Sequence, residues 1–111
     1  MTLPNADFAF VDIRKLRDYA LSPDHESGQH KAVVFASALG LGPEDAEWLR
    51  DRILAAARGG VFKPRGETTH GPLYEMDLPV TTTAGMATVR TGWIVLRGET
   101  FPRLTSCYVA S

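Results

Sequence analysis

The sequence predicts an α+β fold, in which three N-terminal helices pack on one face of a three- or four-stranded antiparallel sheet. Up to Gly60, apolar residues recur three and four positions apart, the spacing of amphipathic helices. Beyond it, apolar and polar residues alternate, as they do in strands with one buried face. With 111 residues, 44% of them hydrophobic, the chain is expected to form a single domain over 1–111 with a core of its own.

Three helices are expected in the first half. The first should run from about Ile13 to Leu21, begin at an N-capping Asp12 and end before Pro23, after a short extended lead-in over 8–11. The second should run from Gln29 to Leu39, where apolar residues line one face: Ala32, Phe35, Ala36 and Leu39. The third should begin at 42–45 and end at 59–60, with these residues inward: Ala46, Leu49, Ile53 and Ala57.

Three strands and one edge segment are expected in the second half. The strands are Leu73–Leu78, Ala87–Leu96 and Leu104–Ala110; Val61 and Phe62 form the edge, and 64–71 is expected as a loop. In the central strand, the face with Val89, Thr91 and Trp93 is the more apolar, so it should meet the helices and leave Arg90 on the open face. The pattern leaves open whether Thr105 or Ser106 shares the face of Arg90.

Charge and composition narrow the classes of function. The net charge of −1 disfavours stable binding of duplex DNA, which needs a basic face, but it allows a small site that contacts a few phosphates. The single cysteine, Cys107, cannot form an internal disulfide. Because no apolar run reaches about 18 residues and no signal peptide is visible, we expect a cytoplasmic protein without a membrane span.

The polar segment 22–32 is the strongest candidate for a functional site. His25 stands in a loop bounded by Gly28, where a histidine with its usual pKa of about 6.5 can exchange protons. The alternative is that His25 is solvated or caps a neighbouring helix. Lys31 lies in the first turn of a predicted helix, against the preference of the helix dipole, which predicts an anionic partner. That partner is either Asp24 or Glu26 in a salt bridge, or a ligand phosphate.

Other types of site are not supported by the residue spacing. His25 and His30 are five positions apart and His70 is remote, so no familiar zinc pattern is present and no metal or cofactor is expected. No G-x-S-x-G elbow or phosphate loop occurs. Neighbouring strands offer further polar groups, as solvated sheets commonly do: Arg90, Arg103, Thr105, Ser106 and Tyr108.

Several segments resemble a family of small bacterial domains of unknown function. They are Leu3-Pro4-Asn5-Ala6, Leu16-Arg17-Asp18-Tyr19, His25-x-x-Gly28-x-x-Lys31-Ala32-x-x-Phe35, Val89-Arg90-Thr91-x-Trp93-Ile94 and Pro102-Arg103-Leu104-Thr105. The family pattern is H-P-x-G-x-x-K-A, and Glu26 stands here where proline is expected. The layout of the family also looks like the barnase–EndoU–colicin–RelE class of metal-independent ribonuclease toxins.

The second resemblance implies cleavage of RNA by attack of a ribose 2′-hydroxyl on the adjacent phosphate. His25 would be the general base or acid. Lys31 and Arg90 would stabilise the phosphorane charge, and Thr105 or Tyr108 would orient a phosphate oxygen. His25, Lys31 and Arg90 should then line one pocket. The alternative is a non-catalytic binding or immunity/antitoxin-type protein with a cognate protein partner, which the near-neutral charge favours.

Overall fold

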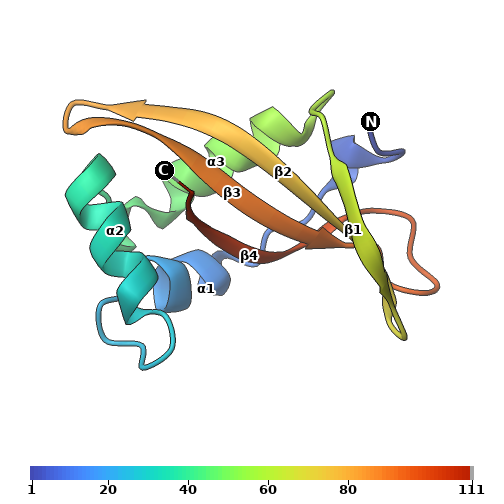
Figure 1. The fold of residues 1–111 in the computed structure, drawn as a ribbon, viewed down its shortest axis with the longest axis horizontal. Helices are drawn as coiled ribbons and strands as arrows, with labels where there is room; N and C mark the ends of the chain where they lie inside the picture. The colour runs from blue at the N-terminus through green and yellow to red at the C-terminus, as the bar shows by residue number, and fades with distance from the viewer. Residues whose placement is uncertain (111) are drawn as a thin grey trace.

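The computed structural model describes residues 1–110, and the helices precede the strands along the chain (Figure 1). Within these residues, three α-helices are followed by one four-stranded antiparallel sheet in the order β1-β2-β3-β4. The helices are α1 (Ile13–Lys15), α2 (Gln29–Leu39) and α3 (Ala46–Ala57); the strands are β1 (Lys63–Thr68), β2 (Gly71–Thr82), β3 (Gly85–Ile94) and β4 (Arg103–Val109). The α+β prediction is confirmed.

The first helix has the predicted extent but not the predicted winding. The side chain of Asp12 caps α1 as expected, because its Oδ1 accepts a hydrogen bond from the N–H of Arg14 at 3.0 Å. From Leu16 to Ala20 the chain continues as a π-helical segment, η2, and the N–H of Leu21 donates to the carbonyl of Leu16 at 2.9 Å. The lead-in also differs, since Ala6–Phe8 is a 3₁₀ turn, η1, and only Phe10 pairs with β4.

The second and third helices follow the sequence closely. α2 has the predicted bounds and ends at Gly40, whose φ of 65° is the left-handed conformation that glycine tolerates. A 3₁₀ turn, η3 (Pro43–Asp45), leads into α3, and the carboxylate of Asp45 accepts from the N–H of Gly42 at 2.9 Å. These short-range signals were sufficient because capping and turn chemistry are local.

The prediction for the first strand was wrong. Residues 64–71 were expected as a loop, but β1 occupies Lys63–Thr68 and pairs with the start of β2. Val61 and Phe62, expected as the edge strand, precede it, and Phe62 is instead buried and exchanges hydrogen bonds with Met1. β1 escapes pattern analysis because every residue except Thr68 is exposed, so no apolar alternation marks it.

A β-bulge in β4 settles the register that the sequence left open. Gly92 pairs with Ser106 and Trp93 with Leu104, so Thr105 is the extra residue. The bulge explains why Leu104 and Cys107 are both buried although they are three positions apart.

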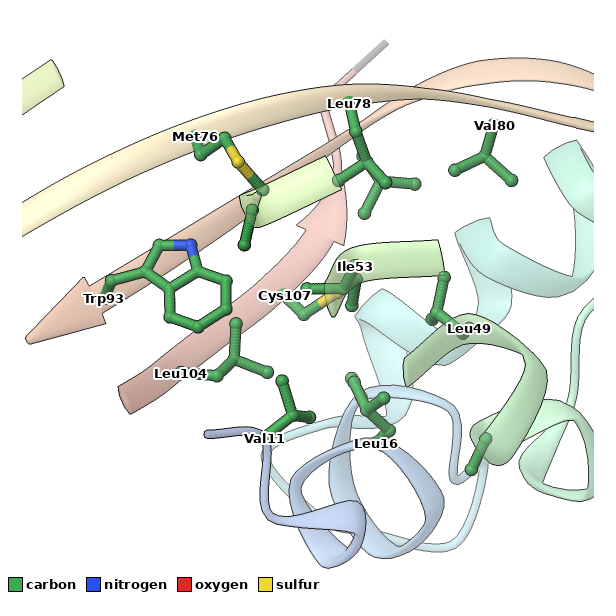
Figure 2. Packing of buried hydrophobic residues seen from close by; sticks show 14 of the residues in the cluster. Val11, Leu16, Leu49, Ile53, Met76, Leu78, Val80, Trp93, Leu104 and Cys107 are labelled. Atoms are coloured by element: carbon green, nitrogen blue, oxygen red, sulfur yellow. The ribbon is translucent and has the colours of Figure 1, made fainter. Parts of the chain in front are cut away.

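The core joins the apolar side of the sheet to the helices, as Figure 2 shows for a part of it. Side chains of β2, β3 and β4 meet side chains of the first helix and α3, among them Met76, Leu78, Trp93, Leu104, Cys107, Leu16, Leu49 and Ile53. Leu49 and Phe35 are fully buried, as their amphipathic stripes predicted. The face of β3 that bears Val89, Thr91 and Trp93 is the buried one, which confirms the prediction for the central strand.

Candidate functional site

His25 lies in the loop between η2 and α2 and is held by its own loop. Its Nδ1 accepts hydrogen bonds from the backbone N–H groups of Ser27 at 3.0 Å and Gly28 at 3.1 Å. A nitrogen that accepts two hydrogen bonds carries the lone pair, so the neutral ring has its hydrogen on Nε2. In residues 1–110, Nε2 has no hydrogen-bond partner. The ring therefore offers one N–H donor to a ligand.

Tyr19, in η2, packs against this histidine. The two rings meet edge to face, with centroids 4.5 Å apart and an interplanar angle of 63°. The loop approaches the helix closely because residue 28 is a glycine, and a Cβ on Gly28 would overlap the carbonyl oxygen of Tyr19. Tyr19 and Gly28 together fix where the His25 ring lies.

Lys31, in the first turn of α2, lies between two aromatic rings. Its ammonium nitrogen is 5.4 Å from the ring centroid of Tyr19 and 5.4 Å from that of Tyr108. Such cation–π contacts leave the positive charge available to an anion. The expected salt bridge to Asp24 or Glu26 is absent, because no carboxylate in residues 1–110 lies within 4.0 Å of Lys31. The two carboxylates lie earlier in the loop, and the side chain reaches the tyrosines instead.

Arg90 forms ion pairs with two carboxylates on the outward side of β3. It donates to Asp77 through Nε at 2.9 Å and Nη2 at 3.0 Å, and Glu75 lies 3.4 Å away. Hydrogen bonds to Asp77, and then to Tyr108, raise the pKa of the Arg90 guanidinium, and the same Asp77 pair lowers the pKa of that carboxyl. Arg90 and Tyr108 are cross-strand partners. Arg90 therefore contacts Tyr108 from the side opposite to the core.

A cleft of about 400 Å³ lies between the first helix and β4 and contains two of the predicted site residues, His25 and Thr105. Its other lining residues include Lys15, Tyr19, Ser106 and Cys107. Lys31 and Tyr108 line a second cleft of about 260 Å³ along the same strand, and Arg90 lines neither cleft. Tyr19 joins the two groups, since its ring contacts both His25 and Lys31. The predicted single pocket is thus a pair of adjoining clefts, with Arg90 outside.

The bulge brings two hydroxyls to the first cleft. Both Thr105 and Ser106 line it, and both hydroxyls lie against Gly92, where a Cβ would be 3.1 Å from the Thr105 Oγ1. Gly92 belongs to the outward side of β3, as Arg90 does. Thr105 and Ser106 therefore both reach the face of Arg90, which the sequence pattern had left open. Sequence alternation alone would have admitted only one of them.

Paired charges leave few cations for a ligand near the cleft. Asp12 holds Arg14 at 2.7 Å and Asp18 holds Arg17 at 2.8 Å. The hydrogen bond from Arg14 lowers the pKa of Asp12 to about 2. Lys15 and Lys31 have no carboxylate within 4.0 Å among residues 1–110. An anion at the two clefts could therefore contact the positive charges of these two lysines, the Nε2–H of His25 and the hydroxyls of Thr105 and Ser106.

Cys107 is not a nucleophile in this site. Its thiol is buried, and burial raises its pKa to about 12, so it stays protonated at neutral pH. Residues 1–110 contain no group of three or more His, Cys, Asp or Glu side chains arranged to hold a metal ion. No helix in this part of the chain is both long and apolar enough to cross a membrane.

Sequence reasoning missed Tyr19 and Lys15 as site residues and left the choice between Thr105 and Ser106 open. Tyr19 was visible only within the family resemblance, because nothing in the sequence marks a π-helical turn. Lys15 looked like one more charge on a solvated helix face, and Ser106 depended on the bulge.

Comparison with known proteins identifies the family of the chain. Residues 2–111 match the model of a family described as Domain of unknown function (DUF6883). No curated protein matches the chain.

Proposed function

The chain belongs to the DUF6883 family, and we propose that it is a small, metal-independent, ribonuclease-like domain that acts on an RNA phosphodiester. One observation carries this proposal. The free Nε2–H edge of His25, the hydroxyl of Thr105 and the cation Lys31 gather around Tyr19 at adjoining clefts. A phosphate needs such convergent donors.

The proposed reaction forms a bond from the ribose O2′ to phosphorus and breaks the bond from phosphorus to O5′. The products are a 2′,3′-cyclic phosphate and a free 5′-hydroxyl. The proton of the 2′-hydroxyl leaves to solvent, and O5′ takes a proton from solvent. The protein contributes donors that bind the phosphorane oxygens more strongly than those of the ground-state phosphate.

His25 is suited to donate and not to accept. In the neutral ring Nε2 bears the hydrogen, so His25 would donate to a phosphorane oxygen, as a neutral imidazole can. For Nε2 to act as a general base, Nδ1 would have to take the hydrogen, and the N–H groups of Ser27 and Gly28 would lose their acceptor. A general acid would need a ring protonated on both nitrogens, and Nδ1 could then no longer accept from these two N–H groups. The loop therefore favours charge stabilisation over proton transfer.

The remaining predicted residues take supporting roles. Lys31 supplies positive charge, and Thr105 orients a phosphate oxygen. Tyr108 positions Lys31, and Arg90 holds Tyr108 while its own charge is neutralised by Asp77. The proposal takes the helices to lie together on one face of the sheet, so that Arg90 and its partners form the open face.

The test uses the purified chain, a short single-stranded RNA and a chelator to remove metal ions. We expect a 2′,3′-cyclic phosphate product, and no cleavage where the scissile nucleotide is 2′-deoxy. His25→Asn retains an acceptor near Nδ1 for the loop but loses Nε2, so it should fold normally and lose roughly 10²–10³-fold in kcat. His25→Gln, which places an N–H near Nε2, should retain more activity.

Two outcomes would contradict the proposal, and each would contradict a different part of it. Equal activity in His25→Asn and the unchanged protein would disprove the role of Nε2. Cleavage that persists on the 2′-deoxy substrate would disprove the proposed reaction.

The alternative, a non-catalytic binding or immunity/antitoxin-type protein, has one observation in its favour. Six arginines are each paired with a carboxylate, which leaves little free positive charge for a polyanion: Arg14, Arg17, Arg50, Arg65, Arg90 and Arg103. This alternative predicts no RNA cleavage, and easy overproduction of the unchanged chain in bacteria. A toxic ribonuclease should instead be produced well only as His25→Asn.

A further inference from the structure

A third cleft adjoins the one that contains His25. It has a volume of about 220 Å³ and shares Asp12, Lys15, Leu104 and Thr105 with the first cleft; the carboxylate of Asp12 is paired with Arg14. Its distinctive member is Phe10, a residue that is 45% exposed although the next residue, Val11, is buried in the core. An exposed aromatic ring beside a phosphate-sized cleft calls for a physical explanation.

Phe10 is held rigidly. Its N–H donates to the carbonyl of Pro102 at 2.9 Å, and its carbonyl accepts from the N–H of Leu104 at 3.0 Å, so it pairs with the edge of β4. Such pairing fixes the backbone, and the ring has only two side-chain torsions left to order. A ligand that binds the ring would therefore lose little to ordering it.

Arg103 stacks between two rings. Its guanidinium carbon lies 5.1 Å from the ring centroid of Phe10 and 5.0 Å from that of Phe101. Glu99 receives both of its hydrogen bonds, at 2.6 Å and 2.7 Å. The charge of Arg103 is thus neutralised, and its plane supports the ring of Phe10 instead of binding a phosphate.

We propose that Phe10, supported by Arg103, is the platform on which a nucleobase of single-stranded RNA stacks next to the phosphate cleft. The inference rests on the proposed function and names the substrate more closely. A ligand that reaches both clefts must carry a planar, partly apolar group attached close to an anion. Lys15 lines both clefts and has no carboxylate within 4.0 Å among residues 1–110. Its positive charge is therefore available to an anion bound where the two clefts meet. A nucleotide has this chemistry, and single-stranded RNA exposes its bases for stacking.

The test measures binding of nucleoside 5′-monophosphates and of ribose 5-phosphate to the full chain by NMR titration. We expect tighter binding of the nucleotides, with upfield shifts of the base protons because the base lies over the ring of Phe10. Phe10→Ala should weaken nucleotide binding roughly 5- to 150-fold, the usual effect of removing one stacking partner, and leave ribose 5-phosphate binding unchanged. Phe10→Leu keeps an apolar contact with Arg103 but has no aromatic ring. The upfield shifts of the base protons should therefore be lost in Phe10→Leu.

Phe8→Ala is the matched control. Phe8 is 72% exposed and only two residues away, but it does not line this cleft. Equal binding of nucleotides and ribose 5-phosphate, or equal losses in Phe8→Ala and Phe10→Ala, would overturn the inference. If RNA is cleaved and Phe10→Ala leaves KM unchanged, the inference fails and the proposed function stands. If nucleotides stack on Phe10 and no RNA is cleaved, the proposed chemistry fails and the stacking site stands.

Discussion

Thr91, at the centre of β3, buries its hydroxyl completely among apolar neighbours. The hydroxyl donates to the carbonyl of Met76 at 2.6 Å and accepts from the indole N–H of Trp93 at 2.7 Å. A buried polar group is tolerated when its hydrogen bonds are made, and both are made here. Thr91 also fixes the orientation of Trp93, the largest fully buried side chain in residues 1–110.

Thr91→Val should therefore destabilise the protein although the side chain keeps its shape. The change leaves the indole N–H of Trp93 without its acceptor and removes the hydroxyl bond to the carbonyl of Met76, which should cost about 1–3 kcal/mol in the free energy of unfolding. A denaturant melt measures this. Thr88→Val, in the same strand and on the opposite face, should stay within about 0.5 kcal/mol. Equal melts for the two variants would mean that the buried hydroxyl contributes nothing.

The sequence indicated individual site residues more readily than their arrangement. His25 stood out as a titratable group in a polar loop, and Lys31 stood out because a cation at a helix start goes against the preference of the helix dipole. Tyr19, which contacts both, has no such feature in the sequence. Arg90 was placed on the correct face, but its pairing with Asp77 depends on the register of two strands, which no local preference sets.

At the scale of single elements, the π-helical segment η2 and the loop after it act together. The wider winding carries Tyr19 to the position where Gly28 packs against its carbonyl oxygen. π-Helical turns are rare and often occur at functional sites, where they re-aim a side chain. Here the segment aims one ring at both candidate ligand-binding groups.

Gly28→Ala tests this packing. The backbone of Gly28 has φ −93° and ψ −13°, which alanine adopts freely, so any effect comes from the overlap of the new methyl with Tyr19. We expect a loss of about 1–3 kcal/mol in stability, as for other overpacked sites, together with shifted NMR signals of the His25 ring. Ser27→Ala, in the same loop and exposed, should leave both unchanged. Unchanged His25 signals in Gly28→Ala would show that the loop position does not depend on Tyr19.

At the scale of the whole molecule, the change of period near residue 60 was enough to predict the architecture. Helical spacing before it and alternation after it correspond to the helices and to β2, β3 and β4. The bulge at Thr105 and the strand β1 were not predicted, because each depends on pairing between segments distant in sequence and leaves no apolar pattern of its own. Apolar patterns and local capping signals could be recognised in the sequence, whereas features set by long-range strand pairing could not.

The exposure of β1 has a consequence for how the protein opens. β1 buries no apolar side chain, and at the far end of the sheet from α2 it is held by its ladder to β2 (Figure 1). Its release should therefore proceed as a local fluctuation that exposes little new surface, while β3 exchanges only when the whole domain unfolds. Native-state hydrogen–deuterium exchange should show amides of β1 exchanging early and almost independently of added urea. The amides of Thr91 and Trp93 should exchange last and respond steeply to urea, so an edge strand and an interior strand of one continuous sheet would belong to separate cooperative units.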